Sequence, residues 1–454
     1  MKPDPNTATG LSPNSLLMTD LYQLNMMQAY LDAGMEETAA FEFFVRKLPS
    51  NRGFLLAAGL EQAIAFLRDA RFHEPDLEWL RSSGQFGSDF LDYLAGVRFD
   101  GDLDAMAEGT AFFPDEPILR VSAPLPCAQL VETRLINILQ YQTLVASKAA
   151  RMVLAAPDQS LVDFGLRRAH SCEAGVLAAR ASYLAGFVGT ATVPAGAAFG
   201  IPIYGTMAQS FIQAHDREVD AFLGFARSRP KATIFLLDTY DTEEAAAKVV
   251  ELAPQLRREG IEVKGIRLDS GDLGAHAFAV RRILDEGGLS YLQIIASGGI
   301  DEAELARLRA TGAPIDAFGI GTSLVTSEDA PALDCAYKLQ EYGGQPKRKR
   351  SEGKATWPGR KQVFLLHGAN GEILKDRLSL AEETFDGEPL LYPVMRLGEL
   401  VAALPDMDEN RARAAKNLKR LPAHLRALQA RPSIPVEVSP ELRSLARELD
   451  GAVS

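Results

Sequence analysis

Polar or glycine-rich turns follow six of seven short apolar runs between residues 161 and 320. The turns are Asp163–His170, Gly205–Ser210, Asp238–Asp241, Arg267–Asp272, Ser297–Asp301 and Gly321–Ser323. Carboxylates there can bind Mg²⁺ or ribose hydroxyls, guanidinium groups bind carboxylates or phosphates, and glycines let the main chain approach an anion. If the runs are parallel strands of a barrel, the turns meet at one end and predict a single site there.

Carboxylates are concentrated in two neighbouring turns. The four candidates are Asp238, Asp241, Asp269 and Asp272. Asp269 and Asp272 are our candidate Mg²⁺ ligands, because Mg²⁺ prefers carboxylates together with substrate phosphates. The plainer interpretation is that Asp269 or Ser270 caps the helix that follows.

The last two turns form the candidate phosphate site. Their residues are Ser297, Gly298 and Gly299 after one run, and Gly319, Gly321 and Thr322 at the end of the next. Barrel enzymes often bind phosphate there, although ordinary turn geometry would also use glycine. Arg167, Arg168 and Arg267 are candidate anion clamps, with a surface ion pair as the alternative for Arg168.

The elements that must position these residues alternate between strands and helices. The apolar runs are Leu161–Phe164, Phe187–Ala191, Ala198–Tyr204, Thr233–Leu237, Val263–Leu268, Leu292–Ala296 and Ile315–Ile320. Helices are expected at Thr242–Arg258, capped by Thr242 and followed by Gly260, and at Asp301–Ala310, capped by Asp301. This alternation predicts parallel βα units, and seven strands fit a closed barrel better than an open sheet.

The segments on either side of the barrel have mixed patterns. We expect strands at 39–45, 109–123, 336–340 and 362–366, and helices at 21–33, 55–69, 76–82, 85–94, 127–152 and 408–428. The predicted organisation is a disordered tail at 1–15, an α/β barrel at 155–330, and a flanking α/β domain built from 16–154 and 331–454.

Composition restricts the partners. The chain has 454 residues, with 48 Lys and Arg against 60 Asp and Glu, a net charge of −12. Nucleic-acid binding requires the opposite balance. The three cysteines, Cys127, Cys172 and Cys335, form no CxxC motif and favour a reducing compartment. We find no secretory signal and no apolar run of the ~20 residues that span a membrane, so we expect a cytoplasmic protein with no membrane partner.

Several sequence strings, in order, resemble the nicotinate phosphoribosyltransferase family. They are residues 18–23 (MTDLYQ), 163–168 (DFGLRR), 205–208 (GTMA), 237–241 (LDTYD), 267–272 (RLDSGD), 297–299 (SGG) and 358–363 (PGRKQV). The resemblance implies a type II phosphoribosyltransferase fold, an irregular α/β barrel with a flanking α/β domain. It also implies that nicotinate and phosphoribosyl pyrophosphate give nicotinate mononucleotide and pyrophosphate, coupled to ATP hydrolysis, in a homodimer with shared active sites.

The same resemblance implies roles for individual residues. Tyr22, from the partner subunit, would stack on the pyridine ring, although a helix-core role is the alternative. The nicotinate pocket would use Arg167, Gly205, Thr206 and Ser210. Catalysis would use Asp238, Arg267, Asp269 and Gln209. The phosphoribosyl group would be bound by Ser270, Gly271, Ser297, Gly298, Gly299, Gly321 and Thr322. In the implied reaction, the pyridine nitrogen would attack the anomeric carbon, and Mg²⁺ and cationic side chains would assist the departure of pyrophosphate.

One position departs from the family pattern. The family has a histidine after Gly-Thr-x-Ala that ATP phosphorylates, and Gln209 stands there in this chain. An amide cannot carry a phosphoryl group as imidazole does. His215 would face elsewhere on a helix, and His170 is a remote candidate. We therefore expect that the phosphoenzyme is lost and that ATP is a non-covalent co-substrate or no longer used.

Three alternatives remain at this stage. The same fold could act on nicotinamide or another pyridine, a base that needs no cation such as Arg167. A phosphate-binding barrel lyase would need a Schiff-base lysine, for which Lys264 is the one to try. A non-catalytic ligand sensor rests on Gln209 alone. Separately, the basic run Lys347–Arg350 could be a nuclear-localisation signal, but a solvated or active-site-rim loop that attracts phosphorylated substrates is favoured.

Overall fold

The computed structural model describes residues 14–429 and 433–451 and divides into two compact units. The flanking unit takes residues up to Leu144 and from Ala332 onward, and the half-barrel unit is Val145–Pro331. Residues 1–13 of the predicted tail lie outside the described residues. Ser15, also predicted in that tail, is fully buried, and its hydroxyl donates to Asp76 at 2.5 Å.

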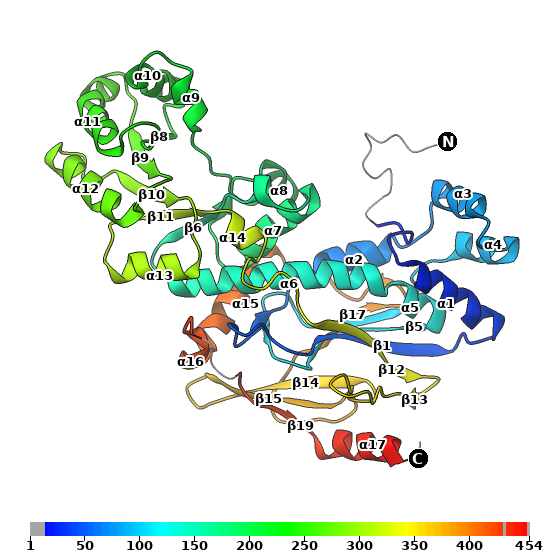
Figure 1. Cartoon of the computed structure of the whole chain (residues 1–454). Coiled ribbons are helices and arrows are strands. Elements are labelled where there is room, and N and C mark those ends of the chain that lie inside the picture. Colours follow the sequence, from blue (N-terminus) through cyan, green and yellow to red (C-terminus); the bar gives the residue numbers. More distant parts are fainter. Residues whose placement is uncertain (1–13, 430–432, 452–454) are drawn as a thin grey trace. The chain divides into compact units, whose positions relative to one another are not determined.

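Six parallel strands form the sheet of the half-barrel unit, in the order β7-β6-β11-β10-β9-β8 (Figure 1). Their bounds are β6 (Ser160–Asp163), β7 (Gly189–Thr190), β8 (Thr233–Leu236), β9 (Val263–Leu268), β10 (Gln293–Ser297) and β11 (Ala317–Ile320). β11 pairs with β6, so the last strand lies beside the first as in a barrel. The sheet is open between its two edge strands, β7 and β8. The predicted irregular βα barrel with a flanking domain is confirmed as a half-barrel, but the expectation of a closed barrel is wrong, because the edge strands β7 and β8 do not pair with each other.

One predicted strand is wrong. The run Ala198–Tyr204 begins in helix α8 (Val193–Phe199), and only Ile203 pairs with the sheet, through a single bridge to Thr190. Gly200 ends the helix in the left-handed conformation at φ +68°, and Pro202 has no N–H to donate to a sheet. Six strands therefore form the sheet where seven were expected.

Helices cover the outside of the half-barrel, with α11, α12 and α13 following β8, β9 and β10 (Figure 1). The helical segments of this unit are η1 (Leu166–Arg168), α7 (Cys172–Ala185), α8, α9 (Gln209–Gln213), α10 (Glu218–Ser228), α11 (Thr242–Arg258), α12 (Leu273–Glu286), α13 (Glu302–Ala310) and α14 (Thr322–Val325). The core between helices and strands contains aliphatic side chains such as Ile266 and Ile294, both 0% exposed, and the packed aromatic pair Phe222–Phe235.

Aspartates cap three of these helices. Asp301 accepts from the Glu304 amide, as predicted. The cap of α11 is Asp241, which accepts from the Glu244 amide, so the prediction of Thr242 was wrong by one residue. The cap of α12 is Asp272, and neither Asp269 nor Ser270 has that role.

The flanking unit is built from both ends of the chain. Its sheets have the orders β13-β12-β1-β5-β3-β17-β18, β16-β14-β15-β19 and β2-β4. The strands are β1 (Thr38–Val45), β2 (Leu55–Leu56), β3 (Asp102–Ala105), β4 (Ala111–Phe112), β5 (Pro117–Pro124), β12 (Cys335–Tyr342), β13 (Gln345–Pro346), β14 (Lys361–His367), β15 (Ile373–Leu380), β16 (Glu388–Pro389), β17 (Tyr392–Arg396), β18 (Glu399–Leu400) and β19 (Val436–Val438). β1 lies between β5 and β12, which joins the N-terminal and C-terminal segments in one sheet.

The helices of the flanking unit differ from expectation in two places. They are α1 (Leu21–Asp32), α2 (Leu60–Arg68), α3 (Glu74–Ser83), α4 (Ser88–Gly96), α5 (Leu125–Leu130), α15 (Met407–Arg420), α16 (Ala423–Arg426) and α17 (Pro440–Gly451). The predicted helix 55–69 starts late, because β2 precedes it and Gly59 has φ +100°. The predicted helix 127–152 is divided at Val131 into α5 and α6 (Glu132–Ala155), and α6 continues into the half-barrel unit.

The basic run Lys347–Arg350 is tied to the last helix. Arg348 donates to the Ala446 carbonyl at 2.9 Å and to Asp450 at 2.6 Å, and Arg350 donates to the Asp450 carbonyl at 2.9 Å. Two of its cations therefore have partners within the flanking unit, while Lys347, Lys349 and Arg350 are exposed, in keeping with the expected solvated loop. Among the helices of the described segments, none is both long enough and apolar enough to cross a membrane.

Candidate functional site

Arg267, near the end of β9, organises the carboxyl ends of the strands. Its Nε donates to Ser297 Oγ at 2.9 Å, and its Nη1 donates to Thr206 Oγ1 at 2.8 Å and to the Met207 carbonyl at 3.3 Å. Its Nη2 donates to Asp269 Oδ1 at 3.0 Å. Four of the five N–H groups of a guanidinium are thus engaged. Arg267 is 9% exposed, so it acts first as an organiser of the site.

Asp269 is held in its charged form by this network. Partial burial acts to raise the pKa of Asp269, but hydrogen bonds from Ser297 and Arg267 and the charge of Arg267 outweigh it and leave the pKa below its usual value. The Ser297 hydroxyl accepts from Arg267 and donates to Asp269. It therefore joins the end of β10 to Arg267 of β9 and to the carboxylate directly after β9. The site therefore presents a carboxylate whose orientation is fixed before any ligand binds.

Gln209, the first residue of α9, lies between two carboxylates. Its amide nitrogen is 3.4 Å from both carboxylate oxygens of Asp238 and 3.4 Å from Asp269 Oδ2. Ser270 Oγ donates to Asp238 Oδ2 at 2.7 Å. An amide that donates to two carboxylates reduces their mutual repulsion. The structure thus brings together Asp238, Asp269, Gln209 and Ser270, all predicted site residues.

Phe164, directly after β6, was not predicted as a site residue. The centre of its ring lies 5.6 Å from the Arg267 guanidinium carbon, within the range of a cation–π contact. A Cβ on Gly319 would lie 2.4 Å from the same ring, so β11 needs glycine there to let the aromatic ring pack. The string Asp163-Phe164-Gly165 belongs to the family resemblance, but the sequence alone does not show that the ring packs against Arg267 and β11.

The two glycine-rich turns predicted for phosphate lie side by side. Ser297 pairs with Gly319 across β10 and β11, so the turns after these strands are neighbours. Gly298 and Gly299 have φ of +93° and +64°, and a Cβ on Gly298 would lie 2.2 Å from the Asp269 carbonyl oxygen. Ser323 Oγ donates to the Ile300 carbonyl at 2.5 Å, which ties one turn to the other. Gly298, Gly299 and Thr322 are exposed and face solvent.

The remaining predicted residues divide between the two units. Gly205 and Ser210 are exposed beside Thr206 and Gln209, and Arg167 is exposed on η1. Gly271 has φ +75° in the turn after Asp269. Tyr22 lies in the flanking unit, on α1, and is 48% exposed; partial burial, and next the charge of Glu132, raise its pKa.

Two of the four predicted carboxylates do not join the site. The side-chain oxygens of Asp241 and Asp272 accept main-chain N–H groups as helix caps. Within residues 14–429 and 433–451, no group of three or more His, Cys, Asp or Glu side chains has the arrangement of a metal site. A cation at this end of the sheet would therefore take most of its ligands from water and substrate, as Mg²⁺ commonly does.

His215 and Lys264, two alternatives raised by the sequence, have partners outside this cluster. His215 is beyond the end of α9, and its Nδ1 is 2.8 Å from the Phe211 carbonyl, so the helical extrapolation from Gln209 did not apply. Lys264 is near the amino end of β9, on the opposite end of the strand from Asp269, and pairs with Glu262 at 2.6 Å. This position does not suit a Schiff-base lysine at the carboxyl ends of the strands.

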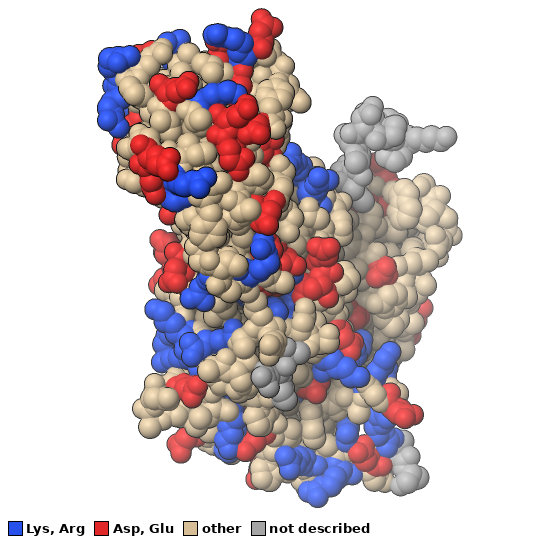
Figure 2. All heavy atoms as spheres, turned by 60° about the vertical axis from the view of Figure 1, so that its left-hand side comes forward, with Lys and Arg blue, Asp and Glu red and all other residues tan. Residues whose placement is uncertain are grey.

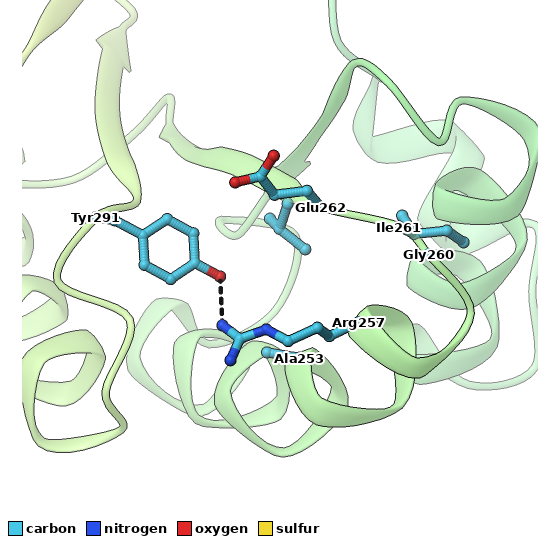
Figure 3. Close-up of a pocket in the computed structure, with 7 residues that line it drawn as sticks. Ala253, Arg257, Gly260, Ile261, Glu262 and Tyr291 are labelled. Carbon is cyan, nitrogen blue, oxygen red and sulfur yellow. Dashed lines mark hydrogen bonds between the residues drawn. The ribbon is translucent and has the colours of Figure 1, made fainter.

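A pocket lies at the amino end of β9, the opposite end of the strand from Asp269 (Figure 3). Its volume is about 510 Å³, and its lining includes Arg257, Glu262 and Tyr291. Arg257 donates to the Tyr291 hydroxyl at 3.3 Å, the contact drawn in Figure 3. None of the predicted site residues lines it.

Surface charge is mixed on the face drawn in Figure 2, where acidic and basic side chains alternate. The net charge of −12 therefore does not appear there as one broad field.

The chain matches three family models in sequence. Residues 17–140 match the nicotinate phosphoribosyltransferase N-terminal domain, residues 159–354 match the nicotinate phosphoribosyltransferase family, and residues 371–446 match the corresponding C-terminal domain.

Similar proteins carry the same description. Nicotinate phosphoribosyltransferase pncB2 of Mycobacterium tuberculosis is 48% identical over 427 residues, which are 93% of this chain and 91% of the relative. The nicotinate phosphoribosyltransferase of Bacillus subtilis is 41% identical over 84% of this chain and 80% of its own length. The crystal structure of human nicotinic acid phosphoribosyltransferase superposes with a TM-score of 0.86 at 32% identity, and covers 95% of this chain and 99% of that chain.

The network around Asp269 predicts a change on removal of one hydroxyl. In Ser297→Ala the pKa of Asp269 should rise, because a hydrogen bond to the charged form is lost while partial burial remains. Carboxyl ¹³C titration of aspartate-labelled protein measures this, with the Asp269 signal identified by its loss in Asp269→Asn. Ser270→Ala is the matched control, since its hydroxyl contacts Asp238. An unchanged or lower pKa of Asp269 in Ser297→Ala would contradict the assignment.

Proposed function

The chain belongs to the nicotinate phosphoribosyltransferase family, and from this premise we propose that the cluster around Arg267 is where nicotinate is joined to phosphoribosyl pyrophosphate. Its activity is that family's reaction, which forms a bond between the pyridine nitrogen and the anomeric carbon. The bond from that carbon to pyrophosphate breaks, and pyrophosphate leaves with the electron pair. The observation that carries the proposal is the convergence of Asp238, Asp269, Gln209 and Arg267 at the carboxyl ends of β8 and β9.

The residues at the strand ends have different proposed roles in this reaction. In our proposal Asp269 and Asp238 face the ribose, where negative charge stabilises an oxocarbenium-like transition state and can accept from ribose hydroxyls. Arg267 keeps Asp269 charged and supplies positive charge near the leaving group. The turns at Gly298–Gly299 and Gly321–Thr322 present main-chain amides to the 5′-phosphate, together with the Thr322 hydroxyl. No protein nucleophile takes part in this step.

The residues of this site suit an Mg²⁺ ion that binds together with the substrate. Asp238 and Asp269 are two carboxylates, fewer than a resident all-protein site would use, and Mg²⁺ often binds through one or two carboxylates plus phosphates and waters. When bound with pyrophosphate, it neutralises charge on the leaving group. Asp272 caps α12 through Oδ1 and is the weaker of the two predicted ligands.

Nicotinate recognition is proposed for the surface formed by η1 and the segment before α9. Arg167 is exposed on η1, and a guanidinium is suited to the carboxylate that distinguishes nicotinate from nicotinamide. We also propose that the protein acts as a homodimer in which Tyr22 of the partner subunit stacks on the pyridine ring. The half-exposed Leu21 and Tyr22 at the start of α1 are consistent with a surface that another molecule covers.

Product formation tests the proposed reaction. The protein with nicotinate, phosphoribosyl pyrophosphate and Mg²⁺ should yield nicotinate mononucleotide, measured by chromatography. Arg167→Ala should raise KM for nicotinate at least about tenfold, the loss expected for one charged hydrogen bond, and should reduce the preference for nicotinate over nicotinamide. Arg168→Ala, altered at the neighbouring position of η1, is the matched control. Absence of product from the unaltered protein would refute the function, and an unchanged base preference in Arg167→Ala would refute the role of Arg167.

Gln209 determines how ATP can be used. We propose that no phosphoenzyme forms, because the amide at position 209 cannot accept the phosphoryl group and instead donates to Asp238 and Asp269. Incubation with γ-labelled ATP should leave no acid-labile label on the protein, whereas Gln209→His should acquire it. ATP stimulation of product yield should be measured alongside, because coupling could survive without a covalent step. Stable label on His215 or His170 of the unaltered protein would overturn the proposal.

A further inference from the structure

Lys148 is a fully buried lysine within the half-barrel unit that the proposed reaction does not use. It lies on α6, and its side chain is 2% exposed. Burial of an unpaired ammonium group is strongly unfavourable, so such a lysine needs anionic partners. Two carboxylates provide them, Glu302 Oε2 at 2.6 Å and Asp329 Oδ1 at 2.7 Å from Nζ.

The two partners follow the two glycine-rich turns. Glu302 is the first residue of α13 and comes three positions after Gly299. Asp329 follows α14, which itself begins at Thr322 directly after Gly321. The ammonium group of Lys148 therefore joins the segment that leaves one turn to the segment that leaves the other. Arg151, one helical turn along α6, adds a contact from its Nε to Glu302 Oε1 at 3.4 Å.

The strands before the turns are paired up to Ser297 and Gly319, so the separation of the turns beyond that pair depends on the segments that follow them. Gly298 and Gly299 occupy left-handed conformations and have no side chain to pack. A direct tie between these segments runs from Ser323 Oγ to the Ile300 carbonyl at 2.5 Å. Without the Lys148 ammonium group, Glu302 and Asp329 would lose their common cation. Repulsion between the two carboxylates would then move the segments after the two turns apart.

We propose that Lys148 is a positioning residue for the 5′-phosphate end of phosphoribosyl pyrophosphate. It sets the spacing of the turns after β10 and β11 through Glu302 and Asp329, without touching the substrate. This inference rests on the proposed function, which assigns the 5′-phosphate to these turns. Its consequence is selective: a change at Lys148 weakens recognition of one end of one substrate and leaves the nicotinate and pyrophosphate subsites as they are.

Steady-state kinetics of Lys148→Met, which keeps an unbranched side chain one atom shorter and removes its charge, tests the proposal. Ribose 5-phosphate and pyrophosphate serve as inhibitors, since each carries one end of the substrate. KM for phosphoribosyl pyrophosphate and Ki for ribose 5-phosphate should both rise about tenfold. KM for nicotinate and Ki for pyrophosphate should stay within about twofold, a split that a general loss of stability would not produce.

Two further variants keep the test decisive. Asp329→Asn removes one of the two ion pairs of Lys148, at a carboxylate that is 21% exposed. It is therefore the variant to use if Lys148→Met does not fold. It should raise Ki for ribose 5-phosphate about threefold. Lys248→Met is the matched control, because it breaks an ion pair with the buried Glu218 between α10 and α11 of the same unit, and it should leave both inhibition constants unchanged.

The outcomes separate the two levels of the proposal. If the unaltered protein forms no nicotinate mononucleotide, the proposed function fails. If the unaltered protein is active and ribose 5-phosphate inhibits Lys148→Met and Asp329→Asn as well as it inhibits the unaltered protein, the positioning role alone is overturned. Equal weakening of ribose 5-phosphate and pyrophosphate would also overturn it.

Discussion

The hydrogen bonds of one half-buried network, centred on the guanidinium of Arg267, determine the arrangement of the site. This group links β9 to Ser297 at the end of β10 and to Thr206 and Met207 before α9. A charge at 9% exposure is tolerated only with good partners, and Asp269 provides the counter-charge. Because these partners come from β10, from the segment before α9 and from the turn after β9, the packing of the strands and the geometry of the site depend on each other.

The sequence located most of these residues but not their tasks. Polar turns at the ends of apolar runs predicted a site at the carboxyl ends of parallel strands, and Arg267, Asp238, Asp269 and Gln209 do converge there. Asp241 and Asp272 occupy similar turns and are the same residue type, yet they cap helices. A cap and a ligand differ in where the following main-chain N–H groups point, which residue identity does not reveal.

Other features depended on distant contacts. The run Ala198–Tyr204 is as apolar as the true strands, but Gly200 and Pro202 prevent a regular strand. Phe164 and Gly319 matter to each other because β6 and β11 are neighbours, although the strands lie at opposite ends of the unit's sequence. Lys148 meets Glu302 across 154 positions of the sequence, so nothing local marks it as part of the proposed phosphate-binding region.

In this structure Arg267 acts through its several directed hydrogen bonds rather than through charge alone. Arg267→Lys keeps the charge and removes the planar fork, and its kcat/KM for phosphoribosyl pyrophosphate is the most direct measurement of that claim. We expect kcat/KM of Arg267→Lys to fall at least about a hundredfold, which is about 2.7 kcal/mol of transition-state stabilisation. The circular dichroism of the variant should be unchanged. A folded Arg267→Lys variant within about threefold of the unaltered protein would contradict this claim.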